Sequence, residues 1–194
     1  MGMRTRALRT GATVMIALSL SAPLAAQGTQ RSAIAIGNFG QINDQYYRGE
    51  QPEGRDYADL ARLGVKMVID LQRGGDPREQ GLVEAAGMKF TRIELTTTDT
   101  PAAGDVEKFL KLVNDPVNQP VYVHCAGGKH RTGVMTAAYR MTHDSWTADQ
   151  AYAEMKKYGF ETLLGHPVLK KFVYDFYATL PAQSNRAAVK SGGN

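Results

Sequence analysis

One ten-residue segment gathers the residue types needed for chemistry on an anion: HCAGGKHRTG, residues 124–133. Five residues separate Cys125 from Arg131, which is enough backbone to curve around a tetrahedral anion. Gly127 and Gly128 permit positive φ, so consecutive N–H groups can turn inward as an anion-binding nest. Arg131 adds a planar fork that can hold two oxygens at once. The residues predicted to bind the anion are Ala126, Gly127, Gly128, Lys129, His130 and Arg131.

Cys125 is the candidate nucleophile of this segment. It follows a strand-like run and precedes a predicted helix, and the positive end of a helix with cationic neighbours favours the thiolate form of cysteine. A thiolate needs no general base, so His124 is interpreted as a neighbour that orients or tunes the sulfur. Thr132 is expected to stabilise the sulfur by a hydrogen bond when it acts as a leaving group. A lone cysteine after a strand is usually a small buried apolar residue, but the chance of the whole pattern at these offsets is on the order of one in a million.

The segment resembles a known signature. Residues 124–133 are similar to the His-Cys-x5-Arg-Thr-Gly motif of the cysteine-based protein tyrosine and dual-specificity phosphatases. Within that superfamily, residues 128–133 look most like the atypical dual-specificity phosphatases of plants and fungi, some of which hydrolyse inositol pyrophosphates. The resemblance implies a protein tyrosine phosphatase-like fold, a phosphocysteine intermediate, no metal and no cofactor. The implied substrate is a phosphorylated protein or an inositol phosphate.

Two further stretches extend the resemblance over about residues 46–160. Residues 47–52, YRGEQP, resemble the Tyr-Arg-Ser-x-x-Pro turn near the start of the family's domain. Residues 63–71 resemble its Leu-Gly-Ile to Val-Ile-Asp-Leu-Arg strand, with Gln72 in place of the family's arginine. A function carried by that arginine is therefore not expected to transfer to this chain.

A general acid is expected upstream of the cysteine, because expelling an alkoxide or a phosphate requires a proton. In the family this acid is an aspartate on a loop before a helix, and residues 96–101, TTTDTP, fit that placement. Asp99 is the predicted acid. Asp105 is the rival candidate, although it is better interpreted as the N-cap of the helix that follows.

The other basic residues near the motif divide into two groups. Lys129 and His130 flank the predicted anion site, so we expect them to contact the substrate, which would suit a substrate with more than one phosphate. His143 and His166 have no partner at a ligand-like spacing and are interpreted as surface or packing residues.

The elements that must position the motif alternate along the chain. Apolar, β-branched runs predict strands over residues 65–71, 88–95 and 120–124. Helical spacing and end signals predict helices over 56–63, 78–86, 131–141 and 147–159, and others beginning near 105 and at Pro167. Strands alternating with helices predict an α/β fold with a largely parallel central sheet flanked by helices. In such sheets the ligand lies at the carboxyl ends of the strands, where Cys125 falls.

The N-terminus predicts export. Three arginines precede an apolar run over residues 14–20 and a small-residue zone ending at Ala26, which is the order of a secretory signal peptide. The apolar run is too short for a spanning helix, which needs about 20 residues. We therefore expect a signal peptide over residues 1–26, no stable membrane insertion after its cleavage, and a periplasmic or secreted protein.

The remainder has the length and composition of one globular domain. Residues 27–180 are predicted to form the catalytic domain and residues 181–194 a flexible tail. Without residues 1–26 the charges are nearly balanced, with 20 basic and 19 acidic residues, so a general nucleic-acid partner is not expected. The single cysteine excludes an internal disulfide framework and a cysteine-rich zinc site.

Three alternatives stand beside a protein phosphatase. The first keeps the mechanism and changes the substrate to an inositol polyphosphate or pyrophosphate, as Lys129 and His130 favour. The second is a phosphoanion-binding pseudophosphatase, against which the presence of Cys125, Arg131 and Thr132 argues. The third is a sulfurtransferase, whose cysteine loop usually lacks this combination of residues.

Overall fold

The computed structural model describes residues 1–2, 34–161 and 166–181. The predicted signal peptide, apart from residues 1–2, and the predicted tail, apart from Pro181, lie outside the described residues. The chain divides after residue 30, and all the described helices and strands belong to the unit formed by residues 31–194. Among the described helices, none is long and apolar enough to cross a membrane.

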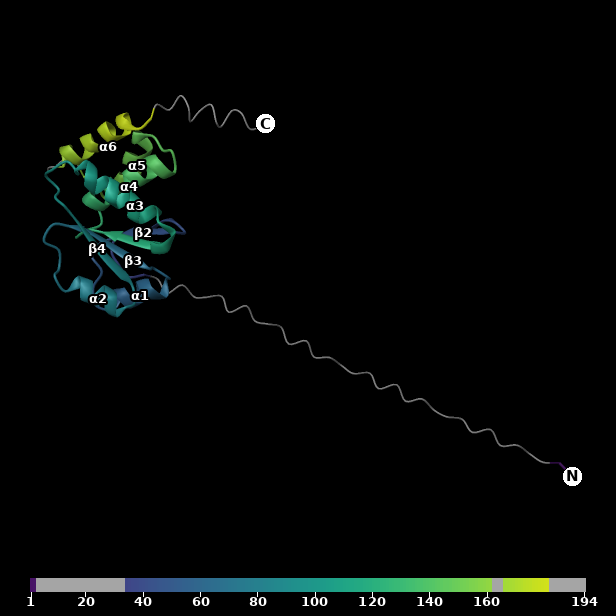
Figure 1. Cartoon of the computed structure of the whole chain (residues 1–194). Helices are drawn as coiled ribbons and strands as arrows, with labels where there is room; N and C mark the ends of the chain where they lie inside the picture. Colours follow the sequence, from purple (N-terminus) through teal and green to yellow (C-terminus); the bar gives the residue numbers. More distant parts are fainter. Residues whose placement is uncertain (3–33, 162–165, 182–194) are drawn as a thin grey trace. The chain divides into compact units, whose positions relative to one another are not determined.

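A five-stranded sheet forms the centre of this unit (Figure 1). Its strands are β1 (Gly40–Asn43), β2 (Tyr46–Gly49), β3 (Met67–Gln72), β4 (Lys89–Leu95) and β5 (Val121–His124), in the order β1-β2-β5-β3-β4. β1 and β2 form an antiparallel hairpin, and every other neighbouring pair is parallel. The predicted α/β fold with a largely parallel sheet is therefore confirmed.

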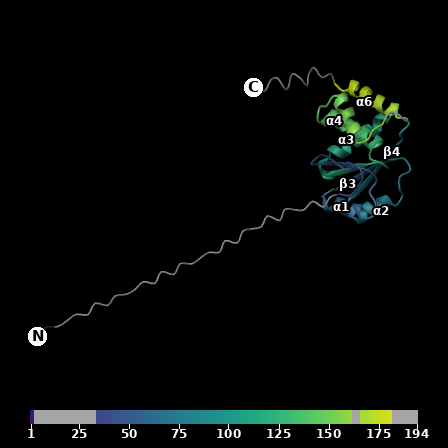
Figure 2. The ribbon, with the colours of Figure 1, turned by 180° about the vertical axis from the view of Figure 1, so that it is seen from behind.

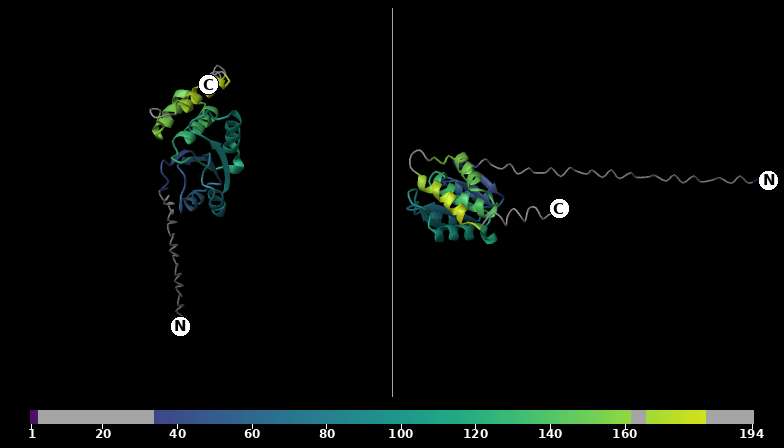
Figure 3. Two further views of the ribbon diagram at one scale, coloured as in Figure 1. Left: turned by 90° about the vertical axis from the view of Figure 1, so that its left-hand side faces the viewer. Right: turned by 90° about the horizontal axis from the view of Figure 1, so that it is seen from above.

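Helices cover both faces of the sheet (Figures 1 and 2). Their bounds are α1 (Asp56–Arg62), α2 (Glu79–Ala85), α3 (Ala103–Asn114), α4 (His130–His143), α5 (Ala148–Lys157) and α6 (Pro167–Thr179), with a short 3-10 turn at Pro116–Asn118. α1 and α2 lie on one face, while α3 to α6 lie on the other, as the left view of Figure 3 also shows.

Side-chain alternation along the strands explains this two-sided cover. In β5, Val121 and Val123 pack in the apolar cluster that includes α3 and α4, whereas Tyr122 packs in a second cluster with residues of α1. In β3, Ile69 and Val68 divide between the same two clusters. A strand buried on both faces reads as a continuous apolar run rather than an alternating one, which is why β3 and β5 were predictable from sequence.

The helix predictions hold with one correction at a helix end. The Thr147–Gln150 pair forms the expected capping box, with Thr147 Oγ1 accepting from the Gln150 N–H at 3.3 Å and Gln150 Oε1 accepting from the Thr147 N–H at 2.9 Å. Asp105 is wrong as an N-cap: α3 begins at Ala103 and its N-cap is Ala102. Asp105 lies in the first turn instead, where a carboxylate still interacts favourably with the helix dipole.

The topology places the ends of three strands at one edge. β3, β4 and β5 are parallel neighbours with β5 in the middle of the sheet. The residues that follow each strand therefore meet at the carboxyl edge, where Cys125 follows β5 and Asp99 follows β4.

Candidate active site

The 125–129 loop joins the central strand β5 to the helix α4. Cys125 is a free thiol with 2 % of its surface exposed. α4 begins at His130, so Arg131 and Thr132 lie in its first turn. The sequence motif thus folds as the predicted strand, loop and helix N-terminus, and its sulfur is buried.

Hydrogen-bond donors from other parts of the chain bind the carbonyl groups of the loop. The Gln51 N–H donates to the Ala126 carbonyl at 3.2 Å. Asn38 Nδ2 donates to the carbonyls of Gly127 and Gly128 at 3.2 and 3.0 Å. The N–H groups of residues 126–129 donate to no other described residue. Because its carbonyls point to these outer donors, the loop leaves its N–H groups available for an anion.

Arg48 in β2 hydrogen-bonds to the loop, a role that was not predicted from the sequence. Its guanidinium is fully buried in β2, donates to the Gly128 carbonyl and stacks 4.0 Å from the centre of the Tyr158 ring. Burial lowers the pKa of Arg48 from its ordinary value. An arginine within the short apolar run YYRG was the available signal, since a buried guanidinium requires hydrogen-bond acceptors.

Gly128 needs to be glycine, whereas Gly127 does not. Gly128 has a φ of 61°, and a Cβ there would lie 2.8 Å from the Glu50 backbone nitrogen. Gly127 has no positive φ, and its Cβ would meet only Lys129 Cγ at 3.9 Å. Both glycines permit positive φ, and of the two only Gly128 adopts it.

We expect Gly128→Ala to destabilise the protein by about 2–4 kcal/mol, because left-handed strain adds to a clash with backbone atoms that cannot move aside. Thermal unfolding and tungstate binding measured by calorimetry are the tests, and both should deteriorate. Gly127→Ala is the matched control and should remain close to wild type in both measurements. Equal stability of the two variants would contradict the assigned loop geometry.

Arg131 and Thr132 retain unused hydrogen-bonding groups beside the loop. Arg131 Nε and Thr132 Oγ1 are buried and have no hydrogen-bond partner among the described residues. Buried polar groups normally have partners, so two such groups in the first turn after Cys125 are consistent with an anion ligand and a sulfur as their intended partners.

Lys129, His130 and His166 form a basic cluster at the side of the loop. The His130 ring lies 4.0 Å from the His166 ring and 5.3 Å from the Phe160 ring. Burial, followed by the positive charges of His166 and Lys129, lowers the pKa of His130 from its ordinary value. His166 was predicted to be a surface or packing residue. It does pack, against the ring of His130, and no sequence spacing indicated that contact.

Asp99 lies in the exposed loop between β4 and α3. Its Oδ2 accepts from Thr96 Oγ1 at 2.7 Å, and its own N–H donates to Thr96 Oγ1 at 3.0 Å. His166 Nδ1 lies 3.0 Å from the Thr97 carbonyl oxygen. The loop that carries the predicted acid thus contacts His166, which belongs to the basic cluster with Lys129 and His130.

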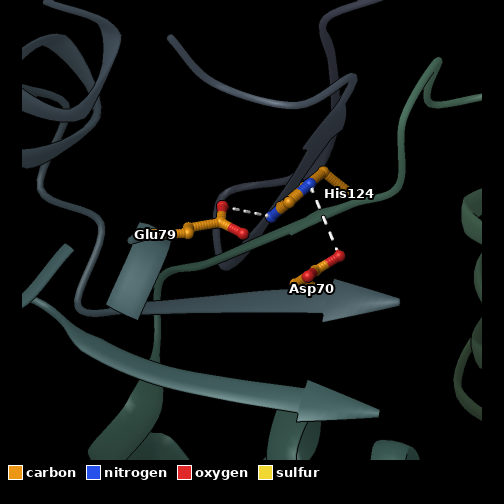
Figure 4. Close-up of side chains that lie close together, drawn as sticks. All are labelled: Asp70, Glu79 and His124. Carbon is orange, nitrogen blue, oxygen red and sulfur yellow. Dashed lines mark ion pairs between the residues drawn. The ribbon is translucent and has the colours of Figure 1, made fainter. Parts of the chain in front are cut away.

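His124 is fully buried at the end of β5. Its Nε2 lies 2.9 Å from Glu79 Oε1, and Nδ1 lies 4.0 Å from Asp70 Oδ1 (Figure 4). The ring faces two carboxylates and has no contact with solvent, which fits the predicted orienting or tuning role better than that of a base.

Comparisons with known proteins agree with this geometry. The family model described as "DSP-PTPase phosphatase fused to NAD+ Kinase" matches residues 35–165. Inositol diphosphatase SIW14 of Saccharomyces cerevisiae is 26% identical over 129 residues, which cover 63% of this chain and 46% of the relative. Dual specificity protein phosphatase TpbA of Pseudomonas aeruginosa is 29% identical over 124 residues, which cover 63% of this chain and 55% of the relative.

The chain spans about half the length of these two relatives. Among solved structures, the core catalytic domain of the PP-IP phosphatase SIW14 from Saccharomyces cerevisiae superposes with a TM-score of 0.65 at 23% identity. The superposition covers 83% of this chain and 96% of that structure. At this identity the likeness establishes the fold.

Proposed function

Since the chain belongs to the DSP-PTPase family of cysteine-dependent phosphatases, we propose that it hydrolyses phosphomonoesters through a phosphocysteine intermediate. One observation carries the proposal. Donors outside the loop bind its carbonyls, while its N–H groups, Arg131 Nε and Thr132 Oγ1 have no partner among the described residues and follow a buried cysteine in the chain. Such a loop binds a phosphoryl group and places it over the sulfur.

The reaction takes two steps on the groups of this chain. In the first, the Cys125 thiolate attacks phosphorus, the P–S bond forms and the bond to the leaving oxygen breaks, while Asp99 gives its proton to that oxygen. The loop N–H groups and Arg131 hold the remaining phosphoryl oxygens as charge develops on them.

In the second step, water attacks the phosphocysteine and gives a proton to the Asp99 carboxylate. The P–S bond breaks, inorganic phosphate leaves and the thiolate is restored, with Thr132 stabilising the departing sulfur. His124 orients or tunes the sulfur and takes no part in the proton transfers.

The proposed substrate is a phosphoprotein, which the enzyme would dephosphorylate at phosphotyrosine alone or, as a dual-specificity phosphatase, also at phosphoserine and phosphothreonine. A second candidate is an inositol polyphosphate or pyrophosphate, which the basic cluster of Lys129, His130 and His166 favours because a second phosphate there would meet additional donors. Relatives named for each of these activities occur among the matches.

Phosphate release from a panel of substrates tests the function. The reduced protein, without added metal, is assayed on p-nitrophenyl phosphate, phosphotyrosine, phosphoserine and phosphothreonine peptides, and an inositol polyphosphate series including a pyrophosphate. Higher kcat/KM on the peptides would identify a protein phosphatase, and higher kcat/KM on the inositol series would identify the second candidate. No release from any substrate by a folded protein that binds tungstate would indicate a pseudophosphatase.

Asp99→Asn is expected to lower kcat by about a hundredfold on phosphopeptides, because general acid catalysis is worth about that much or more. The loss should be smaller on p-nitrophenyl phosphate, since p-nitrophenolate leaves without help from an acid. Asp105→Asn is the control in the first turn of α3 and should stay near wild type. A large loss in Asp105→Asn with none in Asp99→Asn would reverse the assignment.

We also propose that the protein is exported to the periplasm or outside the cell. The order of basic, apolar and small residues before Ala26 supports this. Cell fractionation followed by mass determination of the N-terminus is the test, with a mature chain that begins at Gln27 as the expected result.

A further inference from the structure

Arg48 is a buried arginine that has no carboxylate partner. Its side chain is 0% exposed, and it forms no ion pair within the described part of the chain. Its Nε and Nη1 atoms are buried and have no hydrogen-bond partner among the described residues. Glu154 acts on Arg48 electrostatically, but the Glu154 carboxylate is already paired with Arg140 Nη2 at 2.7 Å. Because arginine stays protonated in proteins, the positive charge of Arg48 is left without a counterion.

The contacts that Arg48 does make lead to the anion-binding loop. Its Nη2 donates to the Gly128 carbonyl, and its guanidinium lies 4.0 Å from the centre of the Tyr158 ring. A carbonyl oxygen and a ring face offer partial negative charge, whereas a buried full charge normally requires an ion of opposite charge as its partner. The hydrogen bond to Gly128 therefore connects an uncompensated cation to the segment that is predicted to bind an anion.

The hydrogen bond from Arg48 also fixes the direction of one N–H group. In a trans peptide unit the C=O and the N–H point in opposite directions, and the peptide between Gly128 and Lys129 is trans. Since the Gly128 carbonyl points to Arg48, the Lys129 N–H points away from Arg48. Asn38 Nδ2 acts in the same way on the preceding peptide, because it accepts no other orientation of the Gly127 carbonyl, 3.2 Å away, than one that turns the Gly128 N–H to the opposite side.

Asn38 does not replace Arg48 in this arrangement. Its single amide group, which has two N–H donors, is shared among the carbonyls of Gly127, Gly128 and Tyr158 at 3.0 to 3.2 Å. It is also neutral. A charged donor on a carbonyl polarises the peptide and strengthens the N–H at its other end as a donor. Arg48 thus adds to the Lys129 N–H an electrostatic contribution that Asn38 does not supply.

We propose that Arg48 is a positioning residue of the anion site: it holds the peptide between Gly128 and Lys129 with the N–H toward the bound anion, and that anion is its counterion. This inference rests on the proposed function, in which the anion is the phosphoryl group of the substrate. The site then uses two arginines in different ways. Arg131 binds phosphoryl oxygens directly, whereas Arg48 acts through a peptide unit and does not touch the substrate.

Tungstate binding and thermal unfolding of Arg48→Met test the proposal. Calorimetric affinity for tungstate should fall about tenfold, which is the usual effect of losing one hydrogen bond from a charged group. The unfolding temperature without anion should stay within about 3 °C of wild type, because an apolar side chain replaces an uncompensated buried charge and the Gly128 carbonyl keeps its bond from Asn38. An arginine with a purely structural role would give the reverse, a lower unfolding temperature with unchanged affinity.

Two further variants separate charge from shape. Arg48→Lys retains the positive charge without the planar fork, so it should recover part of the affinity that Arg48→Met loses. An affinity in Arg48→Lys as low as in Arg48→Met would overturn the assignment of the anion as counterion. Arg62→Met is the matched control, since Arg62 ends α1 with 57% of its side chain exposed. It should leave tungstate affinity unchanged.

Amide NMR of the wild-type protein provides a measurement that needs no folded variant. On addition of tungstate, the amide proton signal of Lys129 should move downfield, as expected for an N–H that gains a charged acceptor. A Lys129 amide signal that does not move at saturating tungstate would overturn the proposal. So would a tungstate affinity of folded Arg48→Met within twofold of wild type.

These readouts do not depend on turnover. If the tungstate and NMR results are as expected but no substrate is hydrolysed, the role of Arg48 in anion binding stands and the proposed function fails. If phosphate is released but Arg48→Met binds tungstate as wild type does, the function stands and the role of Arg48 is wrong.

Discussion

Cys125→Ser is expected to reduce phosphate release by about four orders of magnitude, which corresponds to about 5 kcal/mol of lost transition-state stabilisation. Serine has nearly the same shape as cysteine, but its hydroxyl stays protonated at neutral pH and is a poor nucleophile without an activating base. His124 is not oriented to act as that base, because its two ring nitrogens face Glu79 and Asp70. Steady-state phosphate release with p-nitrophenyl phosphate is the measurement.

Binding of tungstate separates loss of chemistry from loss of structure in this variant. The loop N–H groups and Arg131 do not depend on the sulfur, so calorimetric affinity for tungstate should stay within a few-fold of wild type. Residual activity within tenfold of wild type would show that another group is the nucleophile. Loss of both activity and binding, with a lower unfolding temperature, would indicate a folding defect.

Arg131→Lys should lower kcat/KM by about a thousandfold, at the upper end of the effect of removing one oxyanion donor. The guanidinium offers two parallel N–H groups to two phosphoryl oxygens, whereas the lysine ammonium is a point charge on a flexible stem. Arg131 is fixed in the first turn of α4, and its Nε has no competing partner within the described part of the chain. The loss should appear in both kcat and tungstate affinity.

Arg55→Lys is the matched control for this substitution. Arg55 precedes α1, and its side chain is 81% exposed, so the same chemical change there should leave kcat/KM unaltered. Arg131→Lys with kcat/KM within tenfold of wild type would mean that positive charge alone is sufficient at this position and that the bidentate contact is absent.

The parts of the fold that sequence could predict are those with strong apolar patterns. β3 and β5 are buried on both faces and were predicted as strands from their continuous apolar residues. β1 and β2 were not, because each has four residues and they include Gln41, Asn43 and Arg48. Their place in the sheet comes from pairing with each other and, for β2, with β5, which local pattern does not encode.

The candidate site divides in the same way. The residues of the loop itself were predictable because they are contiguous and follow a strand. Asn38, which lies 90 residues from Gly128, and Glu79 were not, since a single asparagine or glutamate carries no sign of its tertiary partner. The contact between His166 and the loop that carries Asp99 could not be predicted for the same reason.

The burial of Cys125 has a consequence for its reaction with oxidants. A mixed disulfide forms only when a second sulfur reaches the thiolate along the axis of the bond that breaks, and 2 % exposure of Cys125 hinders the approach of a protein or glutathione disulfide. Hydrogen peroxide is close to water in size and meets no such barrier. The burial that positions phosphorus over the sulfur therefore also acts as a size filter, which directs oxidation toward sulfenic acid and away from crosslinking. Phosphate bound in the loop would also block the approach of hydrogen peroxide to the sulfur. Product and substrate would therefore protect the thiol from oxidation.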